Sequence, residues 1–167
     1  MPLDRRIRAG AIVALIGYSV FVAVIGLWPS PVDRPFDSEL FRVLAALKGI
    51  GVRPIDAYNV IEFTANVAFF VVPAVLVVLI VGRRRWWIAP VLGLLCSIAI
   101  ELAQHFLLPH RFATVNDVIA NSLGALIGSG IGVLVLGWRG NRDAAAARRQ
   151  RETHGRRRAV ARDPQSP

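Results

Sequence analysis

The sequence is poor in residues that cross-link the chain or bind metals, and long stretches of it carry no charge. Its one cysteine, Cys96, excludes an intramolecular disulfide. The net charge is nevertheless high, at +9 over the 167 residues. Arginine-rich connections alternate with long apolar runs, and this separation disfavours a soluble nucleic-acid-binding domain, the usual interpretation of such a basic composition.

Four of the apolar runs are long enough to cross a bilayer as helices, which takes about 20 residues. They are predicted at about residues 10–28, 60–81, 86–108 and 116–138. Tryptophans stand at the ends of several runs, as in the aromatic belts of membrane proteins. The first run also resembles a signal peptide, but its length and the lack of a small-residue cleavage site favour a retained span. The sequence therefore predicts an all-α, four-span membrane domain over residues 1–138.

The basic residues are divided unevenly between the two sides of such a domain. The N-terminal segment, the connection between the second and third spans, and the segment after the fourth span together hold 15 of the 20. Because basic residues stay on the cytoplasmic side, both termini are predicted to be cytoplasmic. The chain is accordingly expected in the cell membrane as a multi-pass protein.

The two longest connections have different characters. Residues 30–59 form the predicted outer loop, and apolar residues such as Leu44 recur at helical spacing between Ser38 and Gly49. They predict a short amphipathic helix that lies on the membrane surface or packs over the bundle. Residues 139–167 are rich in Arg, Ala and Gln without apolar periodicity. This tail is predicted to be disordered and cytoplasmic, attracted to anionic lipids without a specific nucleic-acid partner.

Polar side chains inside the apolar spans are the candidate functional residues, because an ionisable group within a membrane is costly. On the predicted topology, all of them fall in the outer halves of the last three spans or in the turn beside them. They are Glu62 and Asn66 of the second span, Glu101 and Gln104 of the third, Arg111 of the turn, and Asp117 and Asn121 of the fourth. Their shared depth predicts one polar cluster in the outer leaflet.

Each of these residues also has a structural interpretation. Asp117 fits a capping box with Thr114, and Glu62 fits a first-turn acid favoured by the helix dipole. The amide side chains could serve as hydrogen-bonding links between helices. Glu101 lies deepest and has no cap to make, so it is predicted to pair with Arg111 or to be protonated.

The same cluster contains groups that could bind a metal or serve acid–base chemistry. His105 and His110 lie near the acids, but the spacing of two histidines around a glutamate that binds zinc is absent. Glu101 or Asp117 with His105 could serve as acid and base, yet no nucleophile motif accompanies them. We therefore predict no metal and no cofactor, assign no catalytic residue, and lean away from an enzyme.

The fourth span carries a strip of small residues at intervals of four. Such a strip lets two helix backbones approach closely, so it predicts helix packing beside the face that carries the polar residues. Its members are Ala120, Gly124, Gly128 and Gly132.

Several of these residues together resemble the signature of VanZ-like membrane proteins. The resemblance rests on Ser97-x-x-x-Glu101-x-x-Gln104, then Arg111, then Asp117-x-x-x-Asn121-x-x-Gly124-x-x-x-Gly128, preceded by a segment from Asn66 to Pro73. It spans roughly residues 60–135. The family often has a glycine soon after the proline, and here Ala74 and Val75 follow it. The resemblance implies functional roles for Glu101, Gln104, Arg111, Asp117 and Asn121, with Asn66 in second rank.

The resemblance also implies a class of phenotype, since the family takes its name from an accessory protein that raises teicoplanin resistance. The favoured hypothesis is an envelope protein whose outer polar site recognises a lipid-linked cell-wall precursor or a lipoglycopeptide. An enzyme acting on an outer-leaflet lipid stays open. A small transporter is disfavoured, because the inner halves of the spans lack polar residues. Purely structural roles and a homo-oligomer remain as further alternatives.

Overall fold

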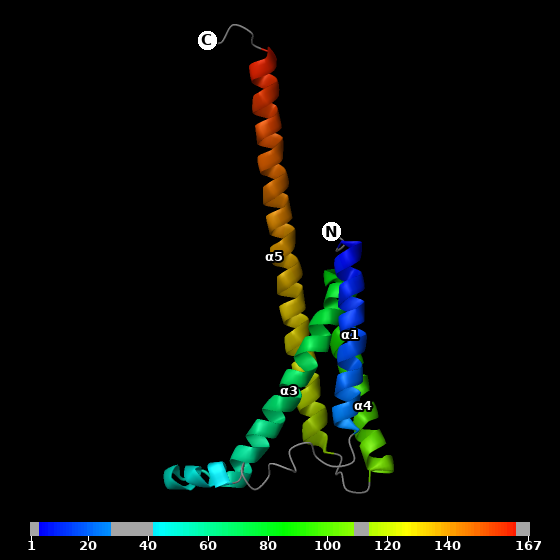
Figure 1. Cartoon of the computed structure of the whole chain (residues 1–167), viewed down its shortest axis with the longest axis vertical. Coiled ribbons are helices and arrows are strands. Elements are labelled where there is room, and N and C mark those ends of the chain that lie inside the picture. The colour runs from blue at the N-terminus through cyan, green and yellow to red at the C-terminus, as the bar shows by residue number, and fades with distance from the viewer. Residues whose placement is uncertain (1–3, 28–41, 109–113, 163–167) are drawn as a thin grey trace.

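The computed structural model describes residues 4–27, 42–108 and 114–162. Four long helices account for most of them, and no strand occurs in these ranges. They are α1 (Arg5–Gly26), α3 (Pro54–Val81), α4 (Ile88–Leu107) and α5 (Val115–Arg162), shown in Figure 1. Each is long and apolar enough to cross a membrane. The predicted all-α architecture with four membrane-spanning helices is therefore confirmed.

The helices begin and end at residues with clear local causes. Asp4 caps α1 by accepting a hydrogen bond from the backbone N–H of Arg6 at 3.1 Å. Pro54 occupies the first turn of α3, where its missing N–H costs nothing. Just before it, the Arg53 guanidinium forms an ion pair with Asp56 at 2.7 Å. Both helices thus start several residues before the predicted spans, because hydropathy marks the apolar part of a helix and not its polar first turn.

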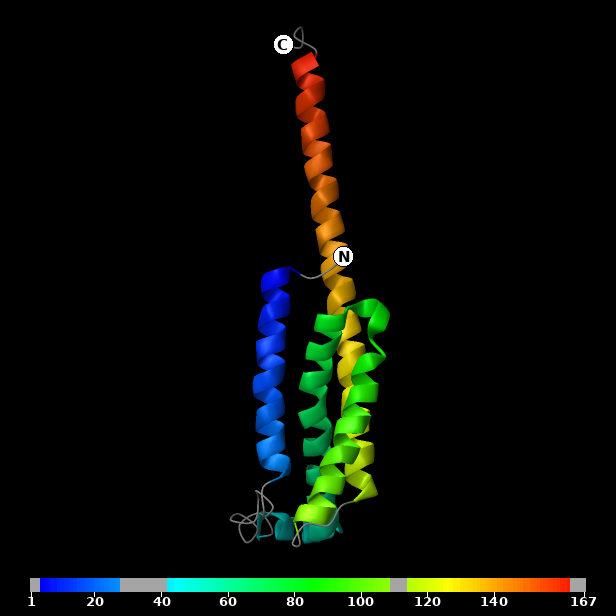
Figure 2. The same cartoon turned by 90° about the vertical axis from the view of Figure 1, so that its right-hand side faces the viewer.

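The chain reverses direction sharply between α3 and α4. Gly82 ends α3 with a φ of 86°, a value that favours glycine. A short 3-10 helix, η3 (Arg83–Arg85), follows and leads into α4. α3 and α4 thereby form a tight antiparallel hairpin. In Figures 1 and 2 this turn and the beginning of α1 lie toward the same end of the bundle, from which the rest of α5 extends.

The opposite end of the bundle carries the described part of the outer loop. Residues 42–45 are helical, and a 3-10 helix, η2 (Ala46–Ile50), continues them. This segment lies beside the beginning of α3, to the side of the other helices in Figure 1, and Leu44 is buried. The other predicted features of this loop, residues 28–41 among them, lie outside the described residues.

Close packing of α3 against α5 forms the centre of the bundle. Three glycines of α5 face α3 so closely that a Cβ on any of them would collide with α3 atoms. Gly124 and Gly128 meet backbone carbonyl oxygens of Val67 and Val71, and Gly132 meets the side chain of Val78. Ala120 is fully buried on the same face of α5. The strip of small residues thus brings the polar face of α5 next to α3.

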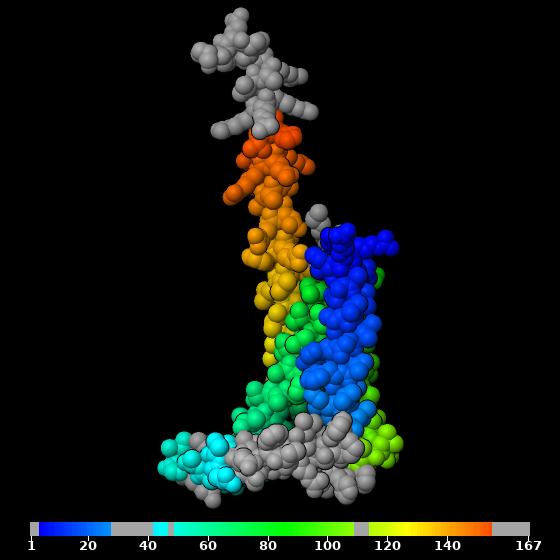
Figure 3. Space-filling model, viewed as in Figure 1, coloured from blue at the N-terminus to red at the C-terminus, as the bar shows by residue number. Residues whose placement is uncertain are grey.

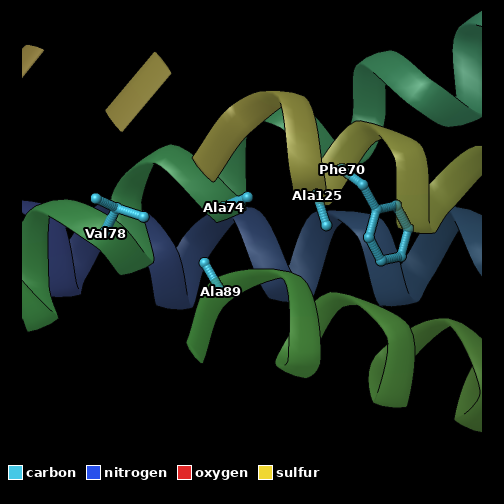
Figure 4. Packing of buried hydrophobic residues seen from close by; sticks show 5 residues of the cluster. All are labelled: Phe70, Ala74, Val78, Ala89 and Ala125. Carbon is cyan, nitrogen blue, oxygen red and sulfur yellow. The ribbon is translucent and has the colours of Figure 1, made fainter. Parts of the chain in front are cut away.

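The remaining helices pack around this pair less tightly. A buried apolar cluster joins α3, α4 and α5, and Figure 4 shows its residues Phe70, Ala74, Val78, Ala89 and Ala125. A Cβ on Gly93 of α4 would collide with Ala125, so α4 approaches α5 closely there. In contrast, Ala11 is the one buried residue of α1, which covers the near face of the bundle in Figure 3.

The segment after the fourth predicted span differs from expectation. α5 does not end near residue 138 but continues to Arg162 and stands clear of the other helices (Figures 1 and 3). The prediction of a disordered tail is wrong for residues 139–162 in this structure. Alanine, arginine, glutamine and glutamate are strong helix formers, and a helix already nucleated in the bundle propagates through them without an apolar face. Arg142 also lies over the Trp138 ring, 4.6 Å from its centre.

Candidate functional site

A small polar cavity lies at the end of the bundle where α1 and α4 end and α5 begins. Its volume is about 100 Å³, and all four long helices line it. Six of the seven polar residues predicted from the sequence line this cavity: Glu62, Asn66, Glu101, Gln104, Asp117 and Asn121. Arg111 lies outside the described residues. Side chains of Val22, Phe70 and Ile100 are among the apolar parts of the wall. We call this space the polar cavity.

Gln104 connects the end of α1 to α4. Its side-chain Nε2 donates a hydrogen bond to the carbonyl oxygen of Gly26 at 2.7 Å, and the residue is buried. The last carbonyls of a helix have no partner within it, so Gln104 satisfies one that would otherwise face the apolar interior. This contact is structural, and it fixes the position of α1 at the rim of the polar cavity.

Glu101 contributes to the start of α5 from a different helix. Its Oε2 accepts a hydrogen bond from the backbone N–H of Thr114 at 2.9 Å, and only 8% of the residue is exposed. Thr114 is the residue before α5, and its hydroxyl accepts from the backbone N–H of Asp117 at 3.1 Å. The N-terminal half of the predicted capping box is therefore present. In a complete box Asp117 would accept the Thr114 N–H, whereas here Glu101 does so.

Because Glu101 accepts the Thr114 N–H, the Asp117 carboxylate can bond to a side chain of α3. Its Oδ1 accepts a hydrogen bond from Asn66 Nδ2 at 2.6 Å, across the closely packed pair of helices. The aspartate still lies in the first turn of α5, where the helix dipole favours a negative charge. Asp117 thus combines the predicted first-turn position with a contact between helices, and its carboxylate remains part of the cavity wall.

Asn121 forms the deepest polar contact of the site. Its Nδ2 donates to the hydroxyl oxygen of Ser97 at 2.9 Å, and both residues are buried. Ser97 belongs to the family-like motif but was given no role from the sequence. Its position four residues before Glu101, on the same face of α4, was the available signal. The backbone groups of Gly26 and Thr114 were also missed, because no side-chain pattern marks a backbone partner.

The cavity offers hydrogen-bonding groups and negative charge. Its lining includes the carboxylates of Glu62, Glu101 and Asp117, of which Glu62 is exposed and Glu101 is buried. Among the lining residues of the described chain, none is a serine, threonine, cysteine or histidine. His105 is exposed and packs edge-on against Phe106 instead. No group of three or more metal-ligating side chains occurs within residues 4–27, 42–108 and 114–162.

An apolar groove adjoins the polar cavity. It has a volume of about 390 Å³, runs between α1, α3 and α4, and reaches Ala125 of α5. Its lining includes Leu15, Tyr18, Pro73, Val77, Leu92 and Cys96. The cavity and the groove share Val22, Phe70 and Ile100, so they are neighbouring parts of one hollow region. A ligand with a polar end and an apolar chain matches this hollow region, with its polar end in the polar cavity and its chain in the apolar groove.

Comparison with known proteins identifies one family model that covers the bundle. The VanZ/LLP1 model matches residues 15–136, which include every described residue of the polar cavity and exclude the extension of α5. No curated protein and no solved structure matches the chain.

Proposed function

The chain belongs to the VanZ/LLP1 family, and from this premise we propose that it binds a lipid-linked molecule of the cell envelope within the membrane. The polar end of the ligand would occupy the polar cavity, and its chain the apolar groove. One observation carries the proposal: polar residues of three helices converge on a cavity that continues into an apolar groove. Such a pairing of polar and apolar walls suits an amphiphilic ligand better than an ion or a soluble metabolite.

The depth of the polar cavity supports a ligand held at headgroup level. Glu101 precedes the end of α4 at Leu107 by six residues, about 9 Å of helix. With both termini cytoplasmic, as the arginine distribution predicts, this depth lies in the outer leaflet. Lipid-linked cell-wall precursors and lipoglycopeptides present amide and sugar groups there. The carboxylates of Glu101 and Asp117 would accept hydrogen bonds from such groups, and Arg111 would contact a phosphate or carboxylate.

The two parts of the hollow region would contribute differently to binding. A chain that moves from the bilayer into the apolar groove leaves surroundings that are equally apolar, so it gains little free energy from the hydrophobic effect. The groove therefore positions the ligand, and the polar cavity supplies selectivity. Substitutions of the polar residues should accordingly weaken binding more than conservative changes in the groove.

An enzyme acting on an outer-leaflet lipid is the second candidate. Two carboxylates, Glu101 and Asp117, line the same cavity, and a pair of carboxylates is one arrangement that acid–base catalysis can use. Each of them also accepts a hydrogen bond that holds helices together, and none of the described lining residues is a serine, threonine, cysteine or histidine. These contacts favour binding. A change in extracted lipids that depended on Glu101 would favour catalysis.

The phenotype of the family gives the first test. We expect teicoplanin resistance in a sensitive bacterium that expresses the chain, and loss of most of it in Glu101→Gln and Asp117→Asn. The glutamine keeps an oxygen that can accept the Thr114 N–H, so the change mainly removes charge. Glu152→Gln and Asp143→Asn are matched controls, because they make the same changes on the extension of α5. Susceptibility is measured at equal membrane levels of each variant. Equal resistance in all five proteins would contradict a functional role of the polar cavity.

A further inference from the structure

A second polar hollow lies at the other end of the bundle, among the arginines. Its volume is about 860 Å³, and residues of α1, α3, η3 and α5 line it. Four arginines contribute to its wall, Arg8 of α1 and Arg83, Arg84 and Arg85 of η3. None of the described lining residues is acidic. We call this space the basic cavity. It is separate from the polar cavity and shares no lining residue with it.

The fold holds these arginines together from segments that are distant in the sequence. Gly82, with its φ of 86°, turns the chain at the end of α3, and the Arg85 N–H bonds to the Gly82 carbonyl oxygen at 3.0 Å. This turn presents three consecutive arginines beside α5. A Cβ on Gly137 of α5 would lie 3.5 Å from Arg83 Nη1, so the Arg83 guanidinium lies alongside that helix. Gly140 and Asn141 continue the α5 side of the wall.

Four guanidinium groups around one hollow repel one another and favour an anion between them. Asp4, the residue before α1, caps that helix by accepting a hydrogen bond from the Arg6 N–H. Arginine is well suited to phosphate, because its planar fork donates two parallel hydrogen bonds to phosphate oxygens. The charge and the chemistry of the wall therefore indicate a phosphate group.

The rest of the wall indicates that this phosphate belongs to a lipid. Leu79, Ile80 and Leu136 line the same cavity as the arginines, so one side of it is apolar. Trp86 and Trp87 follow directly and are exposed, as expected for residues at the membrane interface. A volume of about 860 Å³ also lies in the range of sites for whole ligands rather than single ions.

We propose that the basic cavity binds the headgroup phosphate of an anionic phospholipid, with the acyl chains against the apolar surface of α3 and α5. On the predicted topology this lipid belongs to the inner leaflet. The site does not depend on the ligand of the polar cavity. It lies where α1, α3, η3 and α5 meet, and it differs from diffuse attraction of lipids to the arginines on the extension of α5.

The test measures lipid retained by the full chain after purification in detergent. Native mass spectrometry counts bound phosphatidylglycerol against bound phosphatidylcholine when both are offered at equal concentration. We expect the intact chain to retain phosphatidylglycerol with at least about tenfold preference, since its headgroup is net negative, whereas the choline cation of phosphatidylcholine offsets its phosphate and is repelled by the arginines. Equal retention of the two lipids would overturn the proposal.

Two pairs of variants separate a built site from general charge. Gly137→Leu fills the space beside Arg83 while keeping every charge, and hence the topology. Its control is Gly130→Leu, because a Cβ on Gly130 has no atom within 4 Å. In the second pair, removal of Arg84 and Arg85 together (both to Gln) is compared with removal of Arg148 and Arg149, which are exposed on the extension of α5.

The cavity variants should lose most of the preference, about fivefold or more, and the controls should keep it within about twofold. Equal losses in the cavity variants and their controls would leave only non-specific attraction and overturn the site. If Gly137→Leu does not fold, the arginine pair still decides. Inorganic phosphate is added in a further arm. Displacement of the bound phosphatidylglycerol by millimolar phosphate would assign the arginines to the free ion and not to a lipid.

Discussion

Glu101 supplies the contact that Asp117 would supply in an ordinary capping box, and Asp117 bonds α3 instead. Glu101 accepts the N–H of Thr114 from across the helix interface, and Asp117 accepts from Asn66 of α3. Each carboxylate therefore fixes a neighbouring helix while it lines the polar cavity. A substitution that shortens either side chain changes both the geometry of the site and its charge, whereas the amide variant keeps an accepting oxygen and mainly removes the charge.

The buried Ser97–Asn121 contact gives a stability prediction at this scale. Ser97→Ala leaves Asn121 Nδ2 without its observed acceptor in an apolar interior, and we expect the free energy of unfolding to fall by about 1 kcal/mol. Ser122→Ala is the matched control, because Ser122 Oγ is buried without a hydrogen-bond partner in the described chain. Its removal should leave stability unchanged or slightly raised. Thermal unfolding in detergent measures both, and equal losses would show that the Ser97 contact contributes nothing.

The candidate site could be predicted from the sequence only at the level of which residues converge. Polar side chains in the outer halves of the spans had to meet at one depth, and six of them line one cavity. Their partners followed from tertiary packing instead. The prediction that Glu101 pairs with Arg111 or is protonated stays a prediction, because Arg111 lies outside the described residues. The contact of Glu101 with the backbone N–H of Thr114 carries no signature in the sequence.

At the scale of elements, the pairing of α3 and α5 determines the geometry of the polar cavity. Asn66 and Asp117 approach to 2.6 Å because the glycines of α5 let the two backbones meet. The chain thus uses small residues in place of a large apolar core, since packing and not the hydrophobic effect drives helix association in lipid.

This pairing predicts a strong difference between two glycines of the same helix. Gly128→Ala places a Cβ into the Val71 carbonyl oxygen and the Ala74 side chain, so α3 and α5 must separate. We expect a loss of stability of about 1 to 3 kcal/mol, as for other overpacked cores. Gly130→Ala should be neutral or stabilising, because its Cβ meets nothing within 4 Å and alanine favours helix. Thermal unfolding distinguishes them, and the reverse order would contradict the observed packing.

The helices themselves were predictable to different degrees. Hydropathy located all four spans, because a membrane helix must be apolar along its whole buried length. It missed the polar first turns of α1 and α3, which begin at Arg5 and Pro54. It also missed the extension of α5, because the disorder prediction relied on the absence of an apolar face. A helix that continues an existing one does not need such a face.

At the scale of the whole molecule, two ends of opposite character define the protein. One end has the polar cavity, and the other has the arginines and the extension of α5 (Figures 1 and 2). The beginning of α1 and the end of α5 both lie toward the arginine-rich end (Figures 1 and 2). The arginine distribution predicts that this end faces the cytoplasm.

This orientation is testable with a single introduced thiol. We expect Thr153→Cys, in a background with Cys96→Ala, to react with a membrane-impermeant maleimide only after the cells are opened. Residue 153 is exposed on the extension of α5, so it reacts as soon as the reagent has access to the side of the membrane on which that extension lies. A cysteine introduced at exposed Ile50 of the outer loop is the control and should react in intact cells. The opposite pattern would place the polar cavity in the inner leaflet.

The central claim is that the polar cavity and the apolar groove hold one amphiphilic ligand. Cys96 is the only cysteine of the chain and lines the groove, so its reaction with a membrane-permeant maleimide reports on occupancy. The most direct measurement is this labelling rate for the chain in lipid nanodiscs, with and without teicoplanin or an undecaprenyl-linked cell-wall precursor. The account predicts that at least one of them slows labelling, and that Glu101→Gln with Asp117→Asn abolishes the effect while Glu152→Gln with Asp143→Asn retains it. Unchanged labelling with both probes, or equal protection in both double variants, would contradict it.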